Sequence, residues 1–454
     1  MSTVAAISTP VAAGGIGMIR ISGEDAIGIA SRCFRPVSGR AVTEMRGYTA
    51  AYGVFFDEEG EIDDGVLLIY RAPKSYTGED VAELNCHGGL FLLQKVLRCV
   101  LALGAAPAGP VEFTKRAFLN GKMDLSQAES VMNVIRAQGE QALSAARAAL
   151  RGSVSREADG ICAALIGADA ALAAWADYPD EDIPAVDDRS LEDTLENCRA
   201  RLQTLIRTYD RGKAVTEGVE TVICGKPNVG KSTLMNLLSG CERSIVTPVA
   251  GTTRDVIEET VRVGDLLLRL SDTAGIRDTE DAVESIGVRR AKEKADDAAL
   301  VLLVFDRSRP LDDGDRALLA QTAGKTRVAV INKCDLPPAF SPEALDEEAI
   351  PYRVCVSAKD PNSLAAIQKA LQAALGTDGM DFTQTLLAGE RQRDCCRKAL
   401  THVEDALSAL RSGVTADAVT VDIDCAVDAL LTLTGKKAGE AVVEEVFRRF
   451  CVGK

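Results

Sequence analysis

The sequence is poor in histidine, in paired cysteines and in long apolar runs. Its 454 residues include only two histidines, His87 and His402, which nearly excludes histidine-rich metal sites and most histidine-based triads. The thirteen cysteines are scattered, and none shows the C-x-x-C spacing of a metal or redox site. No apolar stretch approaches a membrane span, and the N-terminus lacks the pattern of a signal peptide. We therefore expect a soluble cytoplasmic protein with reduced thiols.

Acidic residues outnumber basic ones, and the formal net charge is −15. Non-specific binding of nucleic acid depends on clustered Lys and Arg, so this charge argues against it. Any RNA partner must therefore meet a local basic patch. Three short patches qualify, although basic residues at helical spacing more often form a solvated face. The patches are Arg391-Arg393-Arg397-Lys398, Lys436-Lys437 and Arg448-Arg449.

The length predicts about three domains. Residues 1–118 mix strand-like runs with Gly-rich turns and indicate an α+β domain. Residues 119–212 and 381–454 both carry helical patterns, and they can form one all-α domain if the segment between them is an insertion with neighbouring ends. That segment, residues 213–380, has short apolar strands between Gly and Asp loops. The predicted fold is thus multidomain, with an α/β domain inserted into a helical one.

The inserted segment opens with a phosphate-binding loop. After the strand-like run Val219–Cys224, the residues Gly225-x-x-x-x-Gly230-Lys231-Ser232 match this loop at every fixed position. Glycines let backbone N–H groups turn towards the β- and γ-phosphates, Lys231 neutralises their oxygens, and Ser232 offers a hydroxyl to Mg²⁺. A Gly-rich turn between a strand and a helix would explain a lone match equally well.

Four further elements follow, and they favour a guanine nucleotide. Thr253 can supply a second hydroxyl to Mg²⁺, Asp272 can hold the metal through water, and Gly275 can offer its N–H to the γ-phosphate. The carboxylate of Asp335 accepts both N–H donors on one edge of guanine, whereas adenine would leave it unpaired. Together with the loop, these elements predict a Ras-like P-loop GTPase domain. They are Gly251-Thr252-Thr253-Arg254, Asp272-Thr273-Ala274-Gly275, Asn332-Lys333-Cys334-Asp335 and Ser357-Ala358-Lys359.

The glutamine that many GTPases place after the Asp-x-x-Gly motif is absent, and Ile276 stands there. Another group must therefore orient the attacking water and offset the charge on the phosphates, a task worth about 10³ to 10⁵ in rate when an arginine finger performs it. Asn228, inside the loop, is a polar candidate for holding a monovalent cation. Glu284 and Arg277 are candidates for arranging water, and exposed charges on a switch helix would explain them equally well.

These residues resemble the tRNA modification GTPase family MnmE, also called TrmE. The resemblance covers the whole chain, and three of its signatures lie outside the GTPase segment. One departure is Val111, which stands where the family usually has a glycine and where a tight backbone turn is expected. The similar segments are Ser75–Gly89, Glu112–Glu129, Ile245–Asp255, Asp272–Asp278 and Cys451–Lys454.

The resemblance implies a cytosolic homodimer joined through N-terminal domains that bind a folate one-carbon derivative, 5-formyltetrahydrofolate or a related compound. It also implies a heterotetramer with a flavin-dependent partner, MnmG. Together the two proteins would add an aminomethyl or carboxymethylaminomethyl group to C5 of the wobble uridine of certain tRNAs. The GTPase domains would associate across the dimer when K⁺ is bound at the nucleotide, and no membrane is involved.

The resemblance also assigns roles by position. Glu284 would arrange the attacking water, and the thiol of Cys451 would lie beside the one-carbon unit, where packing or positioning is favoured over chemistry. K⁺ would be held by Asn228, Thr247, Val249 and Thr252, Mg²⁺ by Ser232 and Thr253, and folate by Arg20, Glu83, Lys122 and Lys454. The full GTP-binding set is Asn228, Val229, Gly230, Lys231, Ser232, Thr233, Thr247, Pro248, Val249, Ala250, Gly251, Thr252, Thr253, Asp272, Thr273, Ala274, Gly275, Asn332, Lys333, Asp335, Ser357 and Ala358.

Two other functions compete with this interpretation. A ribosome-assembly GTPase can share the GTP motifs and a K⁺-binding asparagine, but such proteins usually add an RNA-binding module or a second GTPase domain, and the sequence shows neither. A scaffold that binds GTP without catalysis would turn over near the unassisted rate of roughly 10⁻⁴ s⁻¹. The rate of hydrolysis therefore separates the catalytic from the scaffold interpretation.

Overall fold

The computed structural model describes residues 2–10, 12–177, 188–240, 259–264, 266–270, 298–348, 350–378 and 385–439, with residues 443, 446 and 447. It divides into two compact units, Met1–Met132 with Asp428–Lys454, and Asn133–Val427. Across these described ranges, no helix combines the length and the apolar character that a membrane span requires.

The first unit is built on a seven-stranded sheet with the order β3-β4-β5-β6-β2-β1-β7. Neighbouring strands are antiparallel, except for the short parallel pair of β1 and β7. The strands are β1 (Val4–Ile7), β2 (Gly14–Ser22), β3 (Phe34–Pro36), β4 (Thr49–Asp57), β5 (Gly60–Tyr70), β6 (Val81–Gly88) and β7 (Ala106–Pro107), and a 3₁₀ turn, η1, spans Val42–Glu44.

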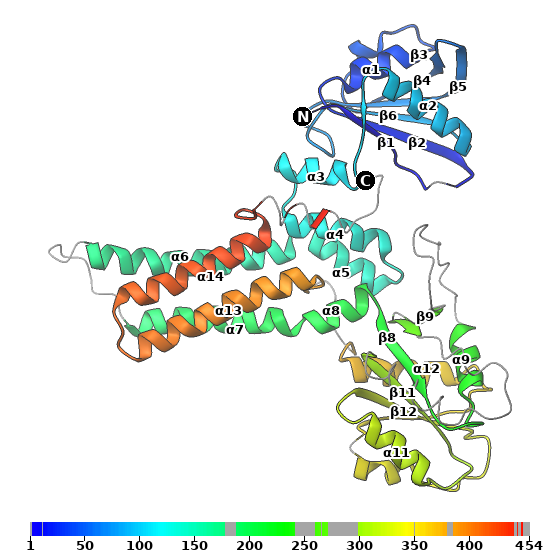
Figure 1. Ribbon diagram of the computed structural model, residues 1–454, viewed down its shortest axis with the longest axis vertical. Coiled ribbons are helices and arrows are strands. Elements are labelled where there is room, and N and C mark those ends of the chain that lie inside the picture. Colours follow the sequence, from blue (N-terminus) through cyan, green and yellow to red (C-terminus); the bar gives the residue numbers. More distant parts are fainter. Residues whose placement is uncertain are drawn as a thin grey trace. The chain divides into compact units, whose positions relative to one another are not determined.

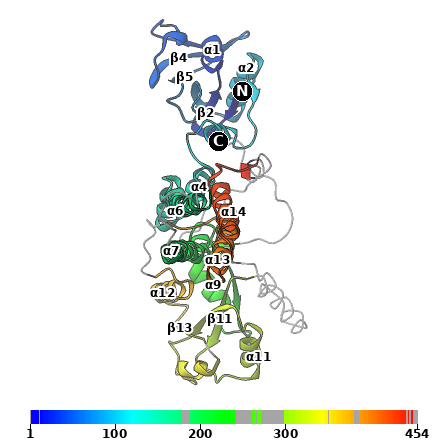
Figure 2. The same ribbon diagram turned by 90° about the vertical axis from the view of Figure 1, so that its left-hand side faces the viewer.

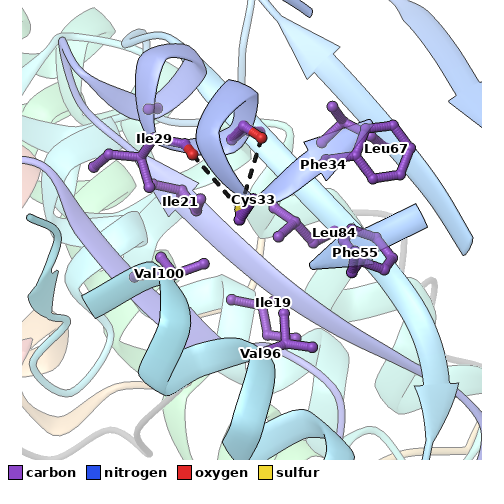
Figure 3. Packing of buried hydrophobic residues seen from close by; sticks show 14 of the residues in the cluster. Ile19, Ile21, Ile29, Cys33, Phe34, Phe55, Leu67, Leu84, Val96 and Val100 are labelled. Carbon is purple, nitrogen blue, oxygen red and sulfur yellow. Dashed lines mark hydrogen bonds between the residues drawn. The ribbon is translucent and has the colours of Figure 1, made fainter. Parts of the chain in front are cut away.

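The core of this unit lies between the sheet and two helices, α1 (Ala26–Cys33) and α2 (Leu90–Ala102). Ile19 and Ile21 of β2 are fully buried and belong to the same apolar cluster as Ile29 of α1 (Figure 3). Successive side chains of a strand point to opposite faces of the sheet. Arg20, between the two isoleucines, therefore points away from this core, where it meets Glu83 of β6.

A buried arginine fixes helix α3 (Glu112–Leu119) to the loop between β5 and β6. The side chain of Arg116 is only 3% exposed. Its guanidinium lies 3.1 Å from the carboxylate of Glu79 and 2.9 Å from that of Glu112. Glu79 also accepts a hydrogen bond of 2.7 Å from the hydroxyl of Ser22 on β2. These contacts connect the helix, the loop and the sheet.

The tight turn before α3 is present although the chain has Val111 where glycine is expected. Val111 is the N-cap of the helix and adopts the left-handed conformation, with φ of 52°. That conformation costs roughly 1–2 kcal/mol in a residue with a Cβ, and β-branched residues adopt it rarely. Val111 is buried in an apolar cluster with Leu125 and Phe447. Packing of the valine side chain therefore offsets part of the backbone strain.

The second unit contains a helical part whose chain segments come before and after an α/β segment in the sequence. Helices α7 and α13 lie side by side in both views and contact each other (Figures 1 and 2). Arg411 of α13 pairs with Glu192 and Glu196 of α7 at 2.7 and 2.6 Å. The helices before and after the α/β segment are α4 (Leu125–Arg136), α5 (Glu140–Leu150), α6 (Ser153–Asp177), α7 (Asp188–Arg207), α8 (Tyr209–Thr216), α13 (Glu390–Arg411) and α14 (Ala416–Thr434), of which α4 and α14 each belong partly to the first unit.

The sheet of the second unit has six strands in the order β13-β12-β11-β8-β10-β9. All neighbours are parallel except β9 and β10. Every residue of β11 is buried, as expected for a strand covered on both faces. The elements are β8 (Val219–Cys224), α9 (Lys231–Ser239), β9 (Glu259–Val263), β10 (Leu266–Leu270), β11 (Leu300–Asp306), α11 (Asp313–Gln321), β12 (Thr326–Asn332), η2 (Pro342–Glu348), β13 (Tyr352–Cys355) and α12 (Ser363–Leu375).

The predicted fold class is confirmed, with an α+β part, a helical part and an α/β part carrying a phosphate loop after its first strand. The apolar side chains of α9 and α12 pack on one face of the second sheet, and those of α11 pack on the other. Strands β8, β11 and β12 run in the same direction, so their carboxyl ends meet at one edge. That edge carries the nucleotide motifs that the structure describes, namely the phosphate loop, Asn332–Asp335 and Ser357–Lys359.

We predict that Arg116→Ala destabilises the first unit by about 3–5 kcal/mol, because it leaves two carboxylates near each other in a buried site without their cation. The measurement is the free energy of opening of the β2 amides from native-state hydrogen exchange. Arg35→Ala is the matched control, since Arg35 pairs with Glu61 and both side chains are more than half exposed. The control should change this energy by less than about 1 kcal/mol. Equal effects would contradict the role given to Arg116.

Candidate functional site

The phosphate loop follows β8 at the edge of the sheet where open α/β folds bind ligands. Two of its residues, Asn228 and Gly230, have positive φ values of 61° and 98°. The ammonium of Lys231 donates to the carbonyl oxygens of Gly225 and Lys226, both at 2.7 Å. Burial lowers the pKa of Lys231 from its ordinary value. The loop thus encloses its own lysine, which points into the ring of backbone groups that a phosphate would enter.

Asn332, at the end of β12, connects the phosphate loop with the last of the nucleotide motifs. Its side-chain amide donates to the carbonyl oxygen of Val229 at 2.9 Å, and its side-chain oxygen accepts from the N–H of Ala358, also at 2.9 Å. Asn332 is only 2% exposed. A Cβ at Gly230 would lie 2.3 Å from its amide nitrogen. Glycine is therefore required at this position by both backbone conformation and space.

Lys333 makes a second connection to the loop. Its ammonium donates to the carbonyl oxygen of Asn228 at 2.7 Å and to the carboxylate of Asp306 at 2.7 Å. Asp306 ends β11 and is buried. Burial would raise the pKa of Asp306, but hydrogen bonds from Lys333 and Ser308 outweigh it and hold the pKa below its ordinary value. Asp306 is therefore ionised at neutral pH and holds Lys333 against the loop.

Asp335 is exposed at the same edge of the sheet. The pKa of its carboxyl is lowered, chiefly by a hydrogen bond with Ser357, with Lys359 and Lys333 adding smaller effects. An ionised carboxylate is the acceptor that a guanine edge needs. The structure therefore brings Asp335 and Ser357 together, from elements that are 22 positions apart in the chain.

Ser232 and Thr233 lie on the first turn of α9, and both are exposed. The hydroxyl of Ser232 is an oxygen donor of the kind that Mg²⁺ prefers, and the side-chain oxygen of Asn228 suits a monovalent cation equally well. The other expected residues of the nucleotide and folate sites lie outside the described residues. They are Thr247, Pro248, Val249, Ala250, Gly251, Thr252, Thr253, Asp272, Thr273, Ala274, Gly275, Arg277, Glu284, Cys451 and Lys454.

A second candidate site lies on the face of the first unit's sheet that is opposite α1 and α2. Arg20 of β2 and Glu83 of β6 are paired at 2.8 Å, with side chains 17% and 12% exposed. The guanidinium of Arg20 also lies 5.7 Å from the ring centre of Tyr76 and 5.4 Å from that of Phe113. Tyr70 donates to Glu83 at 3.3 Å. A charged pair is thus surrounded by aromatic rings.

Lys122 belongs to the same unit and contacts the loop that carries Tyr76. Its ammonium donates to the carbonyl oxygen of Pro73 at 3.0 Å. The hydroxyl of Tyr76 is hydrogen-bonded to that of Thr114 at 2.8 Å, and burial raises the pKa of Tyr76. Three of the four residues expected to bind folate are therefore described, and two of them, Arg20 and Glu83, are in direct contact.

Two family models match the chain. One is described as the MnmE helical domain and matches residues 125–451. The other is described as the GTP-binding protein TrmE N-terminus and matches residues 3–122. The chain belongs to the MnmE family. The predicted family is therefore confirmed.

Curated relatives agree with this assignment over the full length. Proteins named tRNA modification GTPase MnmE from Symbiobacterium thermophilum and Geobacter sulfurreducens are each 42% identical over 456 residues, covering 100% of this chain and 99% of the relative. Among solved structures, an Aquifex aeolicus Era variant bound to GDP and AlF₄⁻ is 25% identical and covers 40% of this chain and 66% of its own, with a TM-score of 0.26. The FeoB G-domain from Methanococcus jannaschii is 21% identical, and the match covers 35% of this chain and 98% of that domain, also with a TM-score of 0.26.

This member of the MnmE family has contacts at both sites that sequence reasoning missed. Lys226, an unspecified position of the loop motif, pairs with Asp312 and Asp315 at 2.5 and 3.0 Å and so fixes the loop to α11. Asp306 could have been noticed as the acidic end of an otherwise apolar strand. Tyr76 lies in one of the family signatures, but no spacing rule connects it with Arg20.

We predict that Gly230→Ala destabilises the α/β part by several kcal/mol more than Gly324→Ala. Both glycines have positive φ values, of 98° and 86°, so each substitution introduces backbone strain of about 1–2 kcal/mol. Only Gly230 adds a clash with Asn332, because a Cβ at Gly324 meets nothing within 4 Å. Hydrogen exchange of the β11 amides measures the difference. Similar losses in the two variants would contradict the packing of Asn332 against the loop.

Proposed function

We propose that this chain is a K⁺-stimulated GTP hydrolase of tRNA modification. With an MnmG-like flavoprotein, it adds an aminomethyl or carboxymethylaminomethyl group to C5 of the wobble uridine of certain tRNAs, using a folate one-carbon donor. The observation that carries the proposal is the 42% identity over the whole chain to proteins named tRNA modification GTPase MnmE. A cytoplasmic homodimer and a heterotetramer with the flavoprotein belong to the same proposal.

The described part of the nucleotide site supports GTP binding. The Lys231 ammonium lies against the loop backbone, where it and the loop N–H groups would contact the β- and γ-phosphates. The phosphate oxygens would replace the loop carbonyls as partners of the Lys231 ammonium. Asp335 would accept the two N–H donors of guanine, with Ser357 positioning its carboxylate. Mg²⁺, held by Ser232 and Thr253, would neutralise charge on the phosphates.

Hydrolysis needs a substitute for the missing glutamine at Ile276. We assign part of this task to K⁺, held by Asn228 with Thr247, Val249 and Thr252, because a cation beside the phosphates offsets the same charge as an arginine finger. The backbone of Asn228 already has a positive φ and is fixed by Lys333, so its side chain starts from a defined position. Glu284 would orient the attacking water, and Arg277 is a further candidate.

The group of residues around Arg20 and Glu83 in the first unit supports binding of a folate. A pterin ring presents adjacent N–H donors, which the carboxylate of Glu83 can accept, and a flat surface, which can stack on Tyr76. Arg20 pairs with Glu83 at 2.8 Å and so fixes the orientation of its carboxylate. Lys122 and Lys454 would neutralise the carboxylates of the folate tail, and Cys451 would pack near the one-carbon unit. We propose four segments, namely residues 1–118 for folate and dimerisation, 119–212 and 381–454 for the helical domain, and 213–380 for the GTPase.

We predict that GTP hydrolysis is at least about tenfold faster in KCl than in NaCl at equal ionic strength, because the cation supplies part of an effect worth about 10³–10⁵. Asn228→Ala should lose most of this stimulation. Asn236→Ala is the matched control, because Asn236 is exposed on the helix that follows the loop. Steady-state phosphate release measures both. Equal rates in the two salts would contradict the cation mechanism, and rates near 10⁻⁴ s⁻¹ in both would favour the GTP-binding scaffold.

We predict that cells lacking this chain have unmodified C5 positions in the wobble uridines of some tRNAs. The intact chain should restore the modification, whereas Lys231→Ala and Arg20→Ala should not, because they remove the phosphate contact and the partner of Glu83. Arg35→Ala changes an exposed arginine of the same unit and should restore it. Mass spectrometry of tRNA nucleosides is the readout. Normal modification in the deleted cells would refute the proposed function.

A further inference from the structure

A cavity lined by arginines lies in the helical part of the second unit, where α5 ends and α6 begins. Its volume is about 350 Å³. The lining carries three cationic side chains and one carboxylate, so it is positive in a chain whose net charge is −15. The lining residues are Glu140, Ser144, Arg147, Ala148, Arg151, Ser153 and Arg156.

The three arginines have no carboxylate partner within the ranges that the structure describes. Arg147 lies on the last turn of α5, and Arg151, four positions later, is the C-cap of that helix. Arg156, on the first turn of α6, donates to the carbonyl oxygen of Arg151 at 2.6 Å. All three side chains are exposed. By contrast, Arg20, Arg116 and Arg411 all pair with glutamates. The charge of the cavity is therefore available to a ligand.

The start of α6 adds donors to the same cavity. Gly152 precedes the helix and its carbonyl accepts from the N–H of Arg156 at 3.0 Å, so the helix begins at Ser153. The N–H groups of a first turn have no acceptor within their own helix, and they favour an anion. Ser153 is 8% exposed, and its hydroxyl oxygen is buried without a hydrogen-bond partner. A buried hydroxyl without a partner is costly, and an anion entering the cavity would supply one.

We propose that this cavity binds a phosphate group of the RNA backbone and so anchors the tRNA on the helical part of the second unit. The inference rests on the proposed function. Guanidinium groups bind phosphate oxygens through paired hydrogen bonds, and the cavity holds three of them beside a helix N-terminus. The side chains are exposed, so a large polyanion can reach them. Because the chain as a whole repels nucleic acid, a local site of this kind determines where tRNA docks.

The test compares two triple variants of the full chain in a fluorescence anisotropy titration with tRNA. One carries Arg147→Ala, Arg151→Ala and Arg156→Ala. The control removes the same charge from exposed positions elsewhere in the helical part, at Arg207, Arg211 and Lys213. The cavity variant should bind tRNA at least about tenfold more weakly, and its slope of log affinity against log salt should fall by about 1 or more. GTP hydrolysis without tRNA should be unchanged in both.

A single substitution, Ser153→Ala, tests the donor at the start of α6. If the Ser153 hydroxyl has no ligand, its removal should leave the variant as stable as the unaltered chain or more stable, and the tRNA affinity should not change. The proposal predicts equal or higher melting temperature together with about threefold or more weaker tRNA binding. The conservative variant Ser153→Thr keeps the hydroxyl and should therefore bind tRNA as tightly as the unaltered chain.

Each outcome has one meaning. Equal tRNA affinity of the cavity variant and the unaltered chain overturns the proposal. An equal loss in the control variant also overturns it, because the effect would then be one of net charge. A further measurement is the melting temperature of both proteins with and without inorganic phosphate. If phosphate raises the melting temperature of the unaltered chain but not that of the cavity variant, while the tRNA affinities are equal, the ligand is a free anion and the proposal fails. If the unaltered chain does not bind tRNA, the proposed function fails instead.

Discussion

The side chain of Asn332 joins three segments of the chain at one edge of a parallel sheet, and the described nucleotide site depends on it. One of its hydrogen bonds goes to the phosphate loop and the other to the backbone of Ala358. Both are buried, so losing either would leave a polar group without a partner. The phosphate loop and the segment that we propose lies beside the guanine base are thereby held in a fixed relation. Asp306 reinforces that relation through Lys333.

Cations in this acidic chain fall into two groups. Arg20 and Arg116 are paired with carboxylates in partly or fully buried places, where they organise the first unit. Lys231 and the arginines around the cavity of α5 and α6 have no carboxylate partner among the described residues and instead contact backbone carbonyls or solvent. Paired cations neutralise carboxylates of the fold, whereas unpaired ones leave their charge available to an anionic ligand. The sequence alone does not distinguish the groups, because pairing depends on tertiary contacts.

The fold class could be predicted because its signals are local. The spacing of Gly230 and Lys231 after an apolar strand predicts the phosphate loop. The recurrence of apolar residues at helical spacing before and after the α/β segment predicts the helical part. Contacts across the chain could not be predicted in this way. The pairing of Lys226 with α11 and the position of Tyr76 beside Arg20 join residues far apart in sequence. The basic cavity was missed because its arginines lie on both sides of a helix break.

The bonds from Lys231 to the carbonyls of Gly225 and Lys226 have a consequence for the entropy of binding. They cross-link the two ends of the phosphate loop through a side chain of the loop itself. The loop conformation is therefore set by contacts within the protein, and a ligand of the loop does not have to bear the full cost of ordering it.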